Sequence, residues 1–448
     1  MKNLKQHKHL IFSCLILLNC VYGFAAVYQV GPSRTYQTPN ALYNANVVQD
    51  GDIIEIDAGD YIGTDALAVW LADDLVIKGV GGRPHLQANG QYIWGKGIWV
   101  VAGNNITVEN IEFSGAAVPS LNGAGIRLDG FGLTVRHCYF HNNENGILTI
   151  NTPNTGDILV EYCEFGYNGY GDGYSHNIYV NSAASFTFRY NYSHHANIGH
   201  CVKSRANENY IYYNRIMDEQ TGVASRLIDI SNGGFSIIMG NLLMQGEQAT
   251  NNNLIGYGLE GLSNSASELY VVNNTMLNKR AASCIFLWIQ SGTSVANVSN
   301  NIFAGTGTII NGTTTSYSNN YINININTIN FVDEPNFDYN LNEVSPAVDF
   351  GTTLSSVGGY SLTPDKMYVH PTSFDARAIS NGTIDAGAYE YGSDVIAPAA
   401  NCETSIEMGD FCVKDSDYGV ILTAPNGNCF RLKVTNSGEL ITEPVQCP

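Results

Sequence analysis

The chain has 448 residues and a formal net charge of −19, from 21 Lys and Arg against 40 Asp and Glu. Such an acidic surface repels the phosphates of nucleic acids and of anionic membranes, so we exclude a nucleic-acid-binding protein. The length fits one large, elongated domain with a small additional module, because compact cores rarely grow beyond about 250–300 residues.

The first 25 residues have the pattern of a secretory signal. Lysines at positions 2, 5 and 8 precede an apolar run, and Gly23-Phe24-Ala25 offers small residues for cleavage before Ala26. No later stretch is long and apolar enough to span a bilayer. We therefore expect a secreted protein, extracellular or periplasmic, without a membrane span.

The next element expected is a helix. Thr38 is a suitable N-cap, Pro39 suits the first helical position, and helix-compatible residues continue to Val48. An open strand edge is a template for aggregation, so we expect this helix to cap the N-terminal end of the fold.

The middle of the chain is a repeat of strands and turns. Short β-rich phrases recur at steps of roughly 20 to 30 residues, which is typical of a solenoid whose coils bury their apolar faces against one another. Each phrase carries an asparagine or a cysteine at one register, expected to stack inside as an amide ladder and as core thiols. These residues are Asn110, Cys138, Cys163, Asn191, Asn214, Asn241, Asn274, Asn301 and Asn320.

This ladder resembles that of right-handed parallel β-helix proteins, the fold of pectate lyases and their relatives, over about residues 50–390. The resemblance implies an all-β fold class. We place the signal at 1–25, the β-helix domain at 26–393 and a linker at 394–401.

Residues 402–448 are expected to form a small module. Its cysteines predict two disulfides in an exported chain, with a zinc site as the alternative. They are Cys402, Cys412, Cys429 and Cys447.

A cationic stretch runs through the centre of the repeat and predicts where an acidic substrate binds. It holds Arg189, Lys203, Arg205, Arg215 and Arg226.

Strand alternation indicates which side chains face outward. It places Tyr179, Lys203 and Asp229 outside on successive coils, about 4.8 Å apart, with Arg205 on the same side as Lys203. Further along, Phe286 and Trp288 are expected outward, where aromatic rings suit sugar faces.

The segment VKSRANENYIYYNRI, followed by Arg226, resembles polysaccharide lyase family six, the chondroitinase B and alginate lyase group. The resemblance implies that Lys203 is the general base, Ser204 its fixed neighbour and Arg226 the acid or the partner of the uronate. The family's acidic calcium ligands have no counterpart in residues 196–200. Arg226 shares the parity of inward Ile228, so it points outward only if the strand begins after it.

The chemistry expected is β-elimination from a uronate, which needs a base, a cation that stabilises the enolate and an acid for the leaving oxygen. Lys203 is the candidate base, and Arg205 or Arg226 can hold the carboxylate. The candidates for the acid are His176, His200 and Tyr179. His194, Asp229 and Trp288 complete the expected site, together with Arg205 as a substrate-binding residue.

The function expected is a lyase on an acidic polysaccharide, or an epimerase that uses the same proton abstraction, with calcium as the one cofactor considered. We expect a monomer. The alternative is a non-catalytic carbohydrate-binding or adhesin-like protein. No metal site is assigned, because the adjacent His194 and His195 point to opposite faces of a strand. A glycosidase is disfavoured, since Asp172 and Asp229 lie two coils apart.

Overall fold

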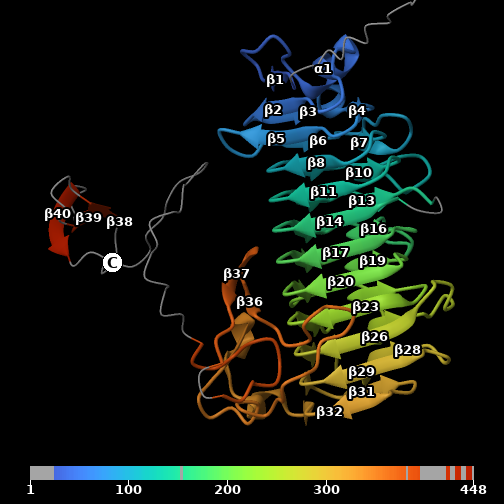
Figure 1. Cartoon of the computed structure of the whole chain (residues 1–448). Helices are drawn as coiled ribbons and strands as arrows, with labels where there is room; N and C mark the ends of the chain where they lie inside the picture. The colour runs from blue at the N-terminus through green and yellow to red at the C-terminus, as the bar shows by residue number, and fades with distance from the viewer. Residues whose placement is uncertain are drawn as a thin grey trace, which may run out of the picture.

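The computed structural model describes residues 25–151, 155–379 and 382–393, together with the backbone of three C-terminal strands. The first three ranges form a parallel β-helix whose coils contribute strands to three long sheets of 12, 10 and 11 strands (Figure 1). The all-β solenoid expected from the repeat is therefore confirmed. No helix in the described part of the chain is long and apolar enough to cross a membrane.

The strands of each sheet follow one another along the solenoid axis. The 12-stranded sheet contains β1 (Val27–Val30), β2 (Ile53–Asp57), β5 (Val76–Val80), β8 (Ile106–Glu109), β11 (Leu133–Arg136), β14 (Asp157–Glu161), β17 (Ser185–Arg189), β20 (Glu208–Tyr212), β23 (Gly234–Met239), β26 (Ser267–Val272), β29 (Val295–Ser299) and β32 (Ser316–Ser318). The 10-stranded sheet contains β4 (Ala68–Trp70), β7 (Gly97–Val101), β10 (Ala124–Leu128), β13 (Asn145–Thr149), β16 (Ile178–Val180), β19 (Val202–Ser204), β22 (Ile228–Ile230), β25 (Asn253–Tyr257), β28 (Cys284–Ile289) and β31 (Gly307–Asn311). The 11-stranded sheet contains β3 (Asp60–Ile62), β6 (His85–Gln87), β9 (Glu112–Ser114), β12 (Tyr139–His141), β15 (Glu164–Gly166), β18 (Tyr192–His194), β21 (Arg215–Met217), β24 (Leu242–Gln245), β27 (Thr275–Asn278), β30 (Ile302–Ala304) and β33 (Tyr321–Asn323).

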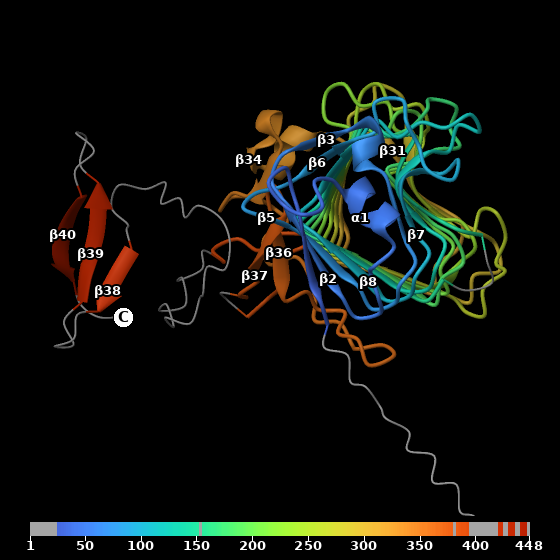
Figure 2. The ribbon, with the colours of Figure 1, turned by 90° about the horizontal axis from the view of Figure 1, so that it is seen from above.

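A short helix, α1 (Pro39–Ala45), lies over the N-terminal end of the coil stack (Figure 2). Thr38 Oγ1 accepts a hydrogen bond from Ala41 N at 3.1 Å, as an N-cap should. The helix ends before the expected Val48, because Asn46 adopts the left-handed conformation that terminates helices (φ 51°). A 3-10 turn, η1 (Gly63–Ala66), packs beside it.

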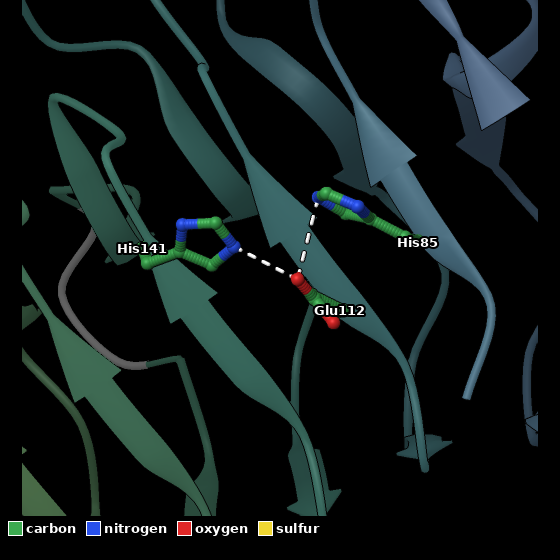
Figure 3. Close-up of side chains that lie close together, drawn as sticks. All are labelled: His85, Glu112 and His141. Atoms are coloured by element: carbon green, nitrogen blue, oxygen red, sulfur yellow. Dashed lines mark hydrogen bonds and ion pairs between the residues drawn. The ribbon is translucent and has the colours of Figure 1, made fainter. Parts of the chain in front are cut away.

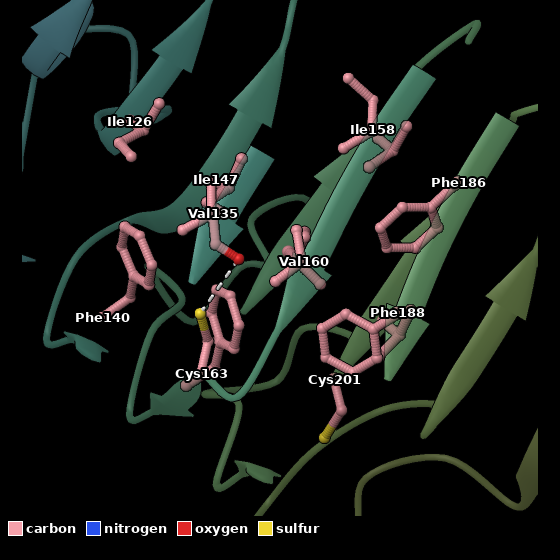
Figure 4. Close-up of a cluster of buried hydrophobic side chains, with 14 of the residues drawn as sticks. Ile126, Val135, Phe140, Ile147, Ile158, Val160, Cys163, Phe186, Phe188 and Cys201 are labelled. Atoms are coloured by element: carbon pink, nitrogen blue, oxygen red, sulfur yellow. Dashed lines mark hydrogen bonds between the residues drawn. The ribbon is translucent and has the colours of Figure 1, made fainter. Parts of the chain in front are cut away.

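The expected amide ladder is present from Asn191 to Asn320. Asn214 Nδ2, for example, donates to Asn241 Oδ1 at 2.9 Å, and the Asn214 backbone N–H donates to the same oxygen at 3.0 Å. Cys138 and Cys163 are buried free thiols, as expected, and the Cys138 N–H donates to Cys163 Sγ at 3.4 Å. Figure 4 shows Cys163 beside Phe140 and Val135 in the core.

The alignment of Asn110 with this ladder is wrong by one residue. The register pairs Glu109 with Arg136, so Asn110 lies opposite His137 and Ile111 lies opposite Cys138. Asn110 and His137 both have left-handed φ values, 55° and 53°. A turn residue of that conformation precedes the ladder position, and asparagine tolerates it well.

The C-terminal segment of the domain packs along the outside of the solenoid (Figure 2). It contains η2 (Ile326–Ile329), η3 (Glu334–Asn336) and two hairpins, β34 (Phe331–Asp333) with β35 (Asp338–Leu341) and β36 (Lys366–Val369) with β37 (Ser373–Ala376). Tyr213 Oη donates to Asp365 Oδ1 at 3.1 Å, and Ala388 N donates to Thr275 Oγ1 at 3.0 Å. These contacts attach the segment to the solenoid.

The last three strands form an antiparallel sheet in the order β38 (Val420–Thr423), β39 (Cys429–Val434), β40 (Leu440–Val445). The predicted disulfides involve Cys402, Cys412, Cys447 and the Cys429 side chain, which lie outside the described residues. The same holds for residues 1–24 of the expected signal and for the linker from 394 onward.

Candidate functional site

One outward-facing row of the 10-stranded sheet brings the predicted residues together. The register pairs Tyr179 with Lys203 and Lys203 with Asp229, on strands β16, β19 and β22. In β16 and β22 one polar residue stands between two buried aliphatic residues, so the aliphatic pair fixes the strand and turns the polar residue outward. Strand alternation therefore predicted this row correctly.

Lys203 is covered although it faces away from the core, with only 6% of its surface exposed. Its Nζ donates to Asp229 Oδ2 at 3.1 Å and to Glu260 Oε1 at 2.6 Å. Glu260 follows β25 in a turn and is itself exposed. Sequence reasoning missed Glu260, because an acid in a loop carries no strand parity to show that it folds back over the sheet.

Arg205 holds the hydroxyl of Tyr179. Its Nε donates to Tyr179 Oη at 2.7 Å, its Nη1 donates to Asn232 Oδ1 at 2.6 Å, and its Nη2 pairs with Glu260. Lys203 Nζ lies 5.4 Å from the centre of the Tyr179 ring. The Tyr179 hydroxyl thus accepts from a guanidinium and keeps its own O–H free to donate.

Arg226 joins the cluster from outside the strand. Strand β22 begins at Ile228, after Arg226, which is the condition under which the arginine can point outward. Its Nη1 lies 3.1 Å from Asp229 Oδ1, and Ser231 Oγ donates to Asp229 Oδ2 at 2.7 Å. Burial alone would raise the pKa of Asp229, but the opposing effects of His200, Lys203 and Arg226 lower it to about 2.

His176 and His200 stack beside this row, with ring centres 4.8 Å apart. Burial lowers the pKa of His200 to about 4 and lowers the pKa of His176 well below its ordinary value. His176 Nδ1 accepts a hydrogen bond from the His200 backbone N–H at 2.9 Å. His200 Nδ1 accepts one from the Arg226 backbone N–H at 3.1 Å. Both rings are therefore neutral at pH 7 and carry their proton on Nε2.

Two expectations about basic and histidine residues are wrong. His194 lies on β18 of the 11-stranded sheet, where its Nδ1 is 2.8 Å from His195 Nδ1, so it is not part of the cluster. Arg189 pairs with Glu161 on the 12-stranded sheet, and Arg215 lies on the 11-stranded sheet. The single cationic patch is thus divided, because consecutive strands of one coil face three directions.

The three cationic side chains that do lie together are nearly neutralised by two carboxylates. Lys203, Arg205 and Arg226 face the carboxylates of Asp229 and Glu260. Since these carboxylates are ion paired, the residues here do not fit a calcium ion, which takes six or more oxygen ligands.

The outward row continues toward the C-terminal coils through Gly256 to Trp288, which is 36% exposed. Phe286, expected outward, is instead fully buried and packs edge-on against Phe303 at 5.3 Å. Strict alternation fails in β28, because residues 286 and 287 both face the core.

A groove on the N-terminal side of Tyr179 lies along the same sheet. It has a volume of about 440 Å³ and is bordered by the turn around Asp172. Its lining consists of polar and aromatic side chains and two leucines from successive coils: Ser120, Leu121, Asn122, Arg127, Asn145, Leu148, Thr149, Asn151, Asp172, Tyr174, Tyr179 and Asn181. Tyr179 therefore stands between the groove and the charged cluster.

Comparisons with known proteins agree with this architecture. Residues 86–227 match the model of a family described as "Right handed beta helix region". Among solved structures, the chain is similar to pectate lyase Pel9A, with 13% identity, a TM-score of 0.55, and coverage of 82% of this chain and 97% of that one. No curated protein matches. The protein is thus a right-handed parallel β-helix of the pectate-lyase-like fold.

Proposed function

We propose that the protein is a lyase that cleaves an acidic, uronate-containing polysaccharide on the face of the 10-stranded sheet. The observation that carries the proposal is the Tyr179–Lys203–Asp229 row, with Arg205 and Arg226 beside it and a polar groove at its end. A polymer lying in the groove reaches Tyr179 first and the cations next.

Each step of the elimination is assigned to one or two residues. Lys203 acts as the base and takes the proton from the carbon next to the uronate carboxylate, whose growing negative charge Arg205 and Arg226 stabilise. The electron pair forms the new C=C bond as the bond to the leaving oxygen breaks. The Tyr179 O–H gives its proton to that oxygen. The Lys203 ammonium then returns a proton to the Tyr179 oxygen through solvent.

Glu260 has to be displaced for this reaction. It pairs with both Lys203 and Arg205, and its side chain is 42% exposed, so an entering uronate carboxylate can take its place. The buried Asp229, held by three partners, stays and keeps Lys203 oriented.

Hydrolysis is less well supported than elimination. A glycosidase requires a carboxylic acid whose pKa is raised so that it can donate a proton. Burial tends to raise the pKa of both Asp229 and Glu260, but their cationic partners lower the pKa of each below its ordinary value.

A second candidate is a carbohydrate-binding protein without catalysis. The observation that favours it is the burial of Lys203 between two carboxylates, which leaves no free amine in the unliganded protein.

A substrate screen separates these candidates. The mature protein is incubated with alginate, chondroitin or dermatan sulfate, and pectate, with and without calcium or a chelator. New absorbance of unsaturated uronate is the result expected for the lyase. Exchange of the uronate C5 proton with D₂O without that absorbance indicates an epimerase, and retention of the polymer without either indicates binding alone. If no acidic polymer is bound or changed, the lyase proposal is wrong and the non-catalytic, adhesin-like candidate takes its place.

A further inference from the structure

A second cluster lies on the 11-stranded sheet, away from the sheet of the candidate site. Strands β6, β9 and β12 contribute His85, Glu112 and His141, whose side chains converge in Figure 3. The register pairs His85 with Glu112 and Ser114 with His141. His141 thus reaches diagonally across one coil to meet the other two.

The spacing of the three donor atoms fits a small tetrahedral cation. Glu112 Oε1 lies 2.9 Å from His141 Nε2 and 3.5 Å from His85 Nε2, and all three atoms lie within 4.8 Å of one another. Zinc bonds of about 2.0–2.1 Å at tetrahedral angles place ligand atoms about 3.3 Å apart. The two contacts to Glu112 lie on either side of that value, and side-chain rotation has to bring the two histidine nitrogens to it as well.

The far nitrogen of each histidine has a polar partner. His141 Nδ1 lies 2.7 Å from Asn142 Oδ1, whereas His85 Nδ1 lies 3.1 Å from Gln87 Nε2 and 3.4 Å from Asp60 Oδ1. Metal-binding histidines are oriented by a carboxylate or carbonyl on the ring nitrogen that does not bind the metal, as Asn142 does for His141 and Asp60 can do for His85. The Nε2 atoms of both rings lie on the side of Glu112.

The cluster is half-buried, so a solvated ion can reach it. The side chains of His85, Glu112 and His141 are 22%, 24% and 18% exposed. Ser114 Oγ lies 2.7 Å from His85 Nε2, and this hydroxyl rotates away when a metal takes the nitrogen lone pair. The Tyr139 ring stacks on His141 at 4.4 Å and limits the movement of the imidazole.

We propose that His85, Glu112 and His141 bind a divalent metal ion of the zinc class, with water in the fourth position. Two nitrogen ligands and one carboxylate suit zinc and its neighbours rather than calcium, which prefers oxygen alone. The ion joins three successive coils of the solenoid. The site does not depend on the proposed lyase function, since it lies on another sheet.

The test uses the full mature chain without an affinity tag, with Zn²⁺ and Co²⁺ as probes. The wild type should bind one Co²⁺ at this site, with the visible absorption of a tetrahedral nitrogen and oxygen environment, and Zn²⁺ should displace it and raise the melting temperature. The double variant His85→Ala/His141→Ala should bind at least about tenfold more weakly. Glu112→Gln, which keeps the side-chain size, should weaken binding in the same direction.

Two controls make the result specific. His137→Asn removes an exposed histidine four positions before His141 and suits the left-handed backbone there, so it should bind like the wild type. Metal bound by cysteines of the C-terminal module would give intense thiolate charge-transfer bands that persist in the double variant. The proposal is overturned if the wild type shows no tetrahedral Co²⁺ absorption free of those bands, or if the double variant keeps it unchanged.

Discussion

Asn214 illustrates how one residue type holds the solenoid together. Its amide donates to Phe188 O at 2.8 Å and to Asn241 Oδ1 at 2.9 Å, so it joins three successive coils. The register of this ladder was readable from the sequence, because an asparagine or a cysteine recurs at one position within each β-rich phrase. The misplacement of Asn110 shows the limit, since asparagine also suits the left-handed turn residue one position earlier.

Replacing Asn214 with Leu should therefore lower the melting temperature. Each ladder partner left buried without a hydrogen bond costs about 1–3 kcal/mol. Thermal unfolding followed by circular dichroism is the measurement. Asn207→Leu is the matched control, because Asn207 is exposed and lies outside the ladder. Equal melting temperatures for the two variants would refute the role given to the ladder.

His200 gives the fold a definite pH dependence. Burial lowers its pKa from 6.5 to about 4 in the folded protein, so between these values the unfolded chain binds a proton that the folded chain does not. Stability should fall as pH drops through this window, by about 1.4 kcal/mol per pH unit for this group. Asp229 acts at lower pH, where its contribution is lost as pH falls from 3.8 through about 2.

Urea unfolding at several pH values checks this expectation. His200→Asn places an amide oxygen where Nδ1 accepts from Arg226 N and removes the titrating ring. The variant should show a shallower loss of stability between pH 6.5 and 4 than the wild type. Parallel curves would mean that His200 is not held neutral by burial.

Glu260 offers a test of how the polymer enters. Glu260→Gln removes a negative charge that competes with the uronate, so it should tighten binding of the acidic polymer about two- to fivefold, in line with the energy of exposed charge pairs. Affinity electrophoresis measures the change. Glu247→Gln removes the same charge in an exposed turn outside the cluster and should have a smaller effect. Weaker binding by Glu260→Gln than by the wild type would show that Glu260 helps to hold the polymer.

At the scale of the elements, strand parity determined what could be predicted about the site. Tyr179, Lys203 and Asp229 were placed correctly, because each aligns in register on a short strand. Arg189 and Arg215 were grouped with them only by sequence distance, which says nothing about which of three sheets a residue joins. Glu260 was missed because it is far from Lys203 in sequence. Its loop comes from a later coil and folds back over Lys203.

The C-terminal segment depends on a buried ion pair. Arg377 and Glu390 lie 3.0 Å apart with side chains 0% and 1% exposed, and Arg377 also donates to Gly387 O at 2.9 Å. Arg377→Ala should destabilise the protein by about 3–5 kcal/mol, because it leaves a buried carboxylate without its partner.

Limited proteolysis and thermal unfolding report this loss. Lys366→Ala in the same segment breaks an ion pair with the exposed Asp365 and should cost less than about 1 kcal/mol. If Arg377→Ala were no more sensitive than Lys366→Ala, the ion pair would not be what holds the segment together.

At the scale of the whole molecule, stacking converts sequence distance into distance along one axis. Residues 57 positions apart, Lys203 and Glu260, meet because the loop after β25 folds back across the coil of β22 toward β19. The same stacking brings His85, Glu112 and His141 together on a different sheet. The fold could be predicted from the period of the sequence repeat. These side-chain contacts depend on the paths of loops and on side-chain conformations, which the period does not determine.

The most direct test of the proposed active site is the turnover of Lys203→Ala on an acidic polysaccharide that the wild type cleaves, followed by unsaturated-uronate absorbance. We expect an unchanged fold and largely retained polymer binding, with turnover reduced by roughly 10²–10⁴-fold, as expected for the loss of a general base. Arg226→Ala should lose less, because Arg205 still holds the carboxylate. Full turnover by Lys203→Ala would contradict the account and transfer the proton abstraction to His176 or His200 with Tyr179.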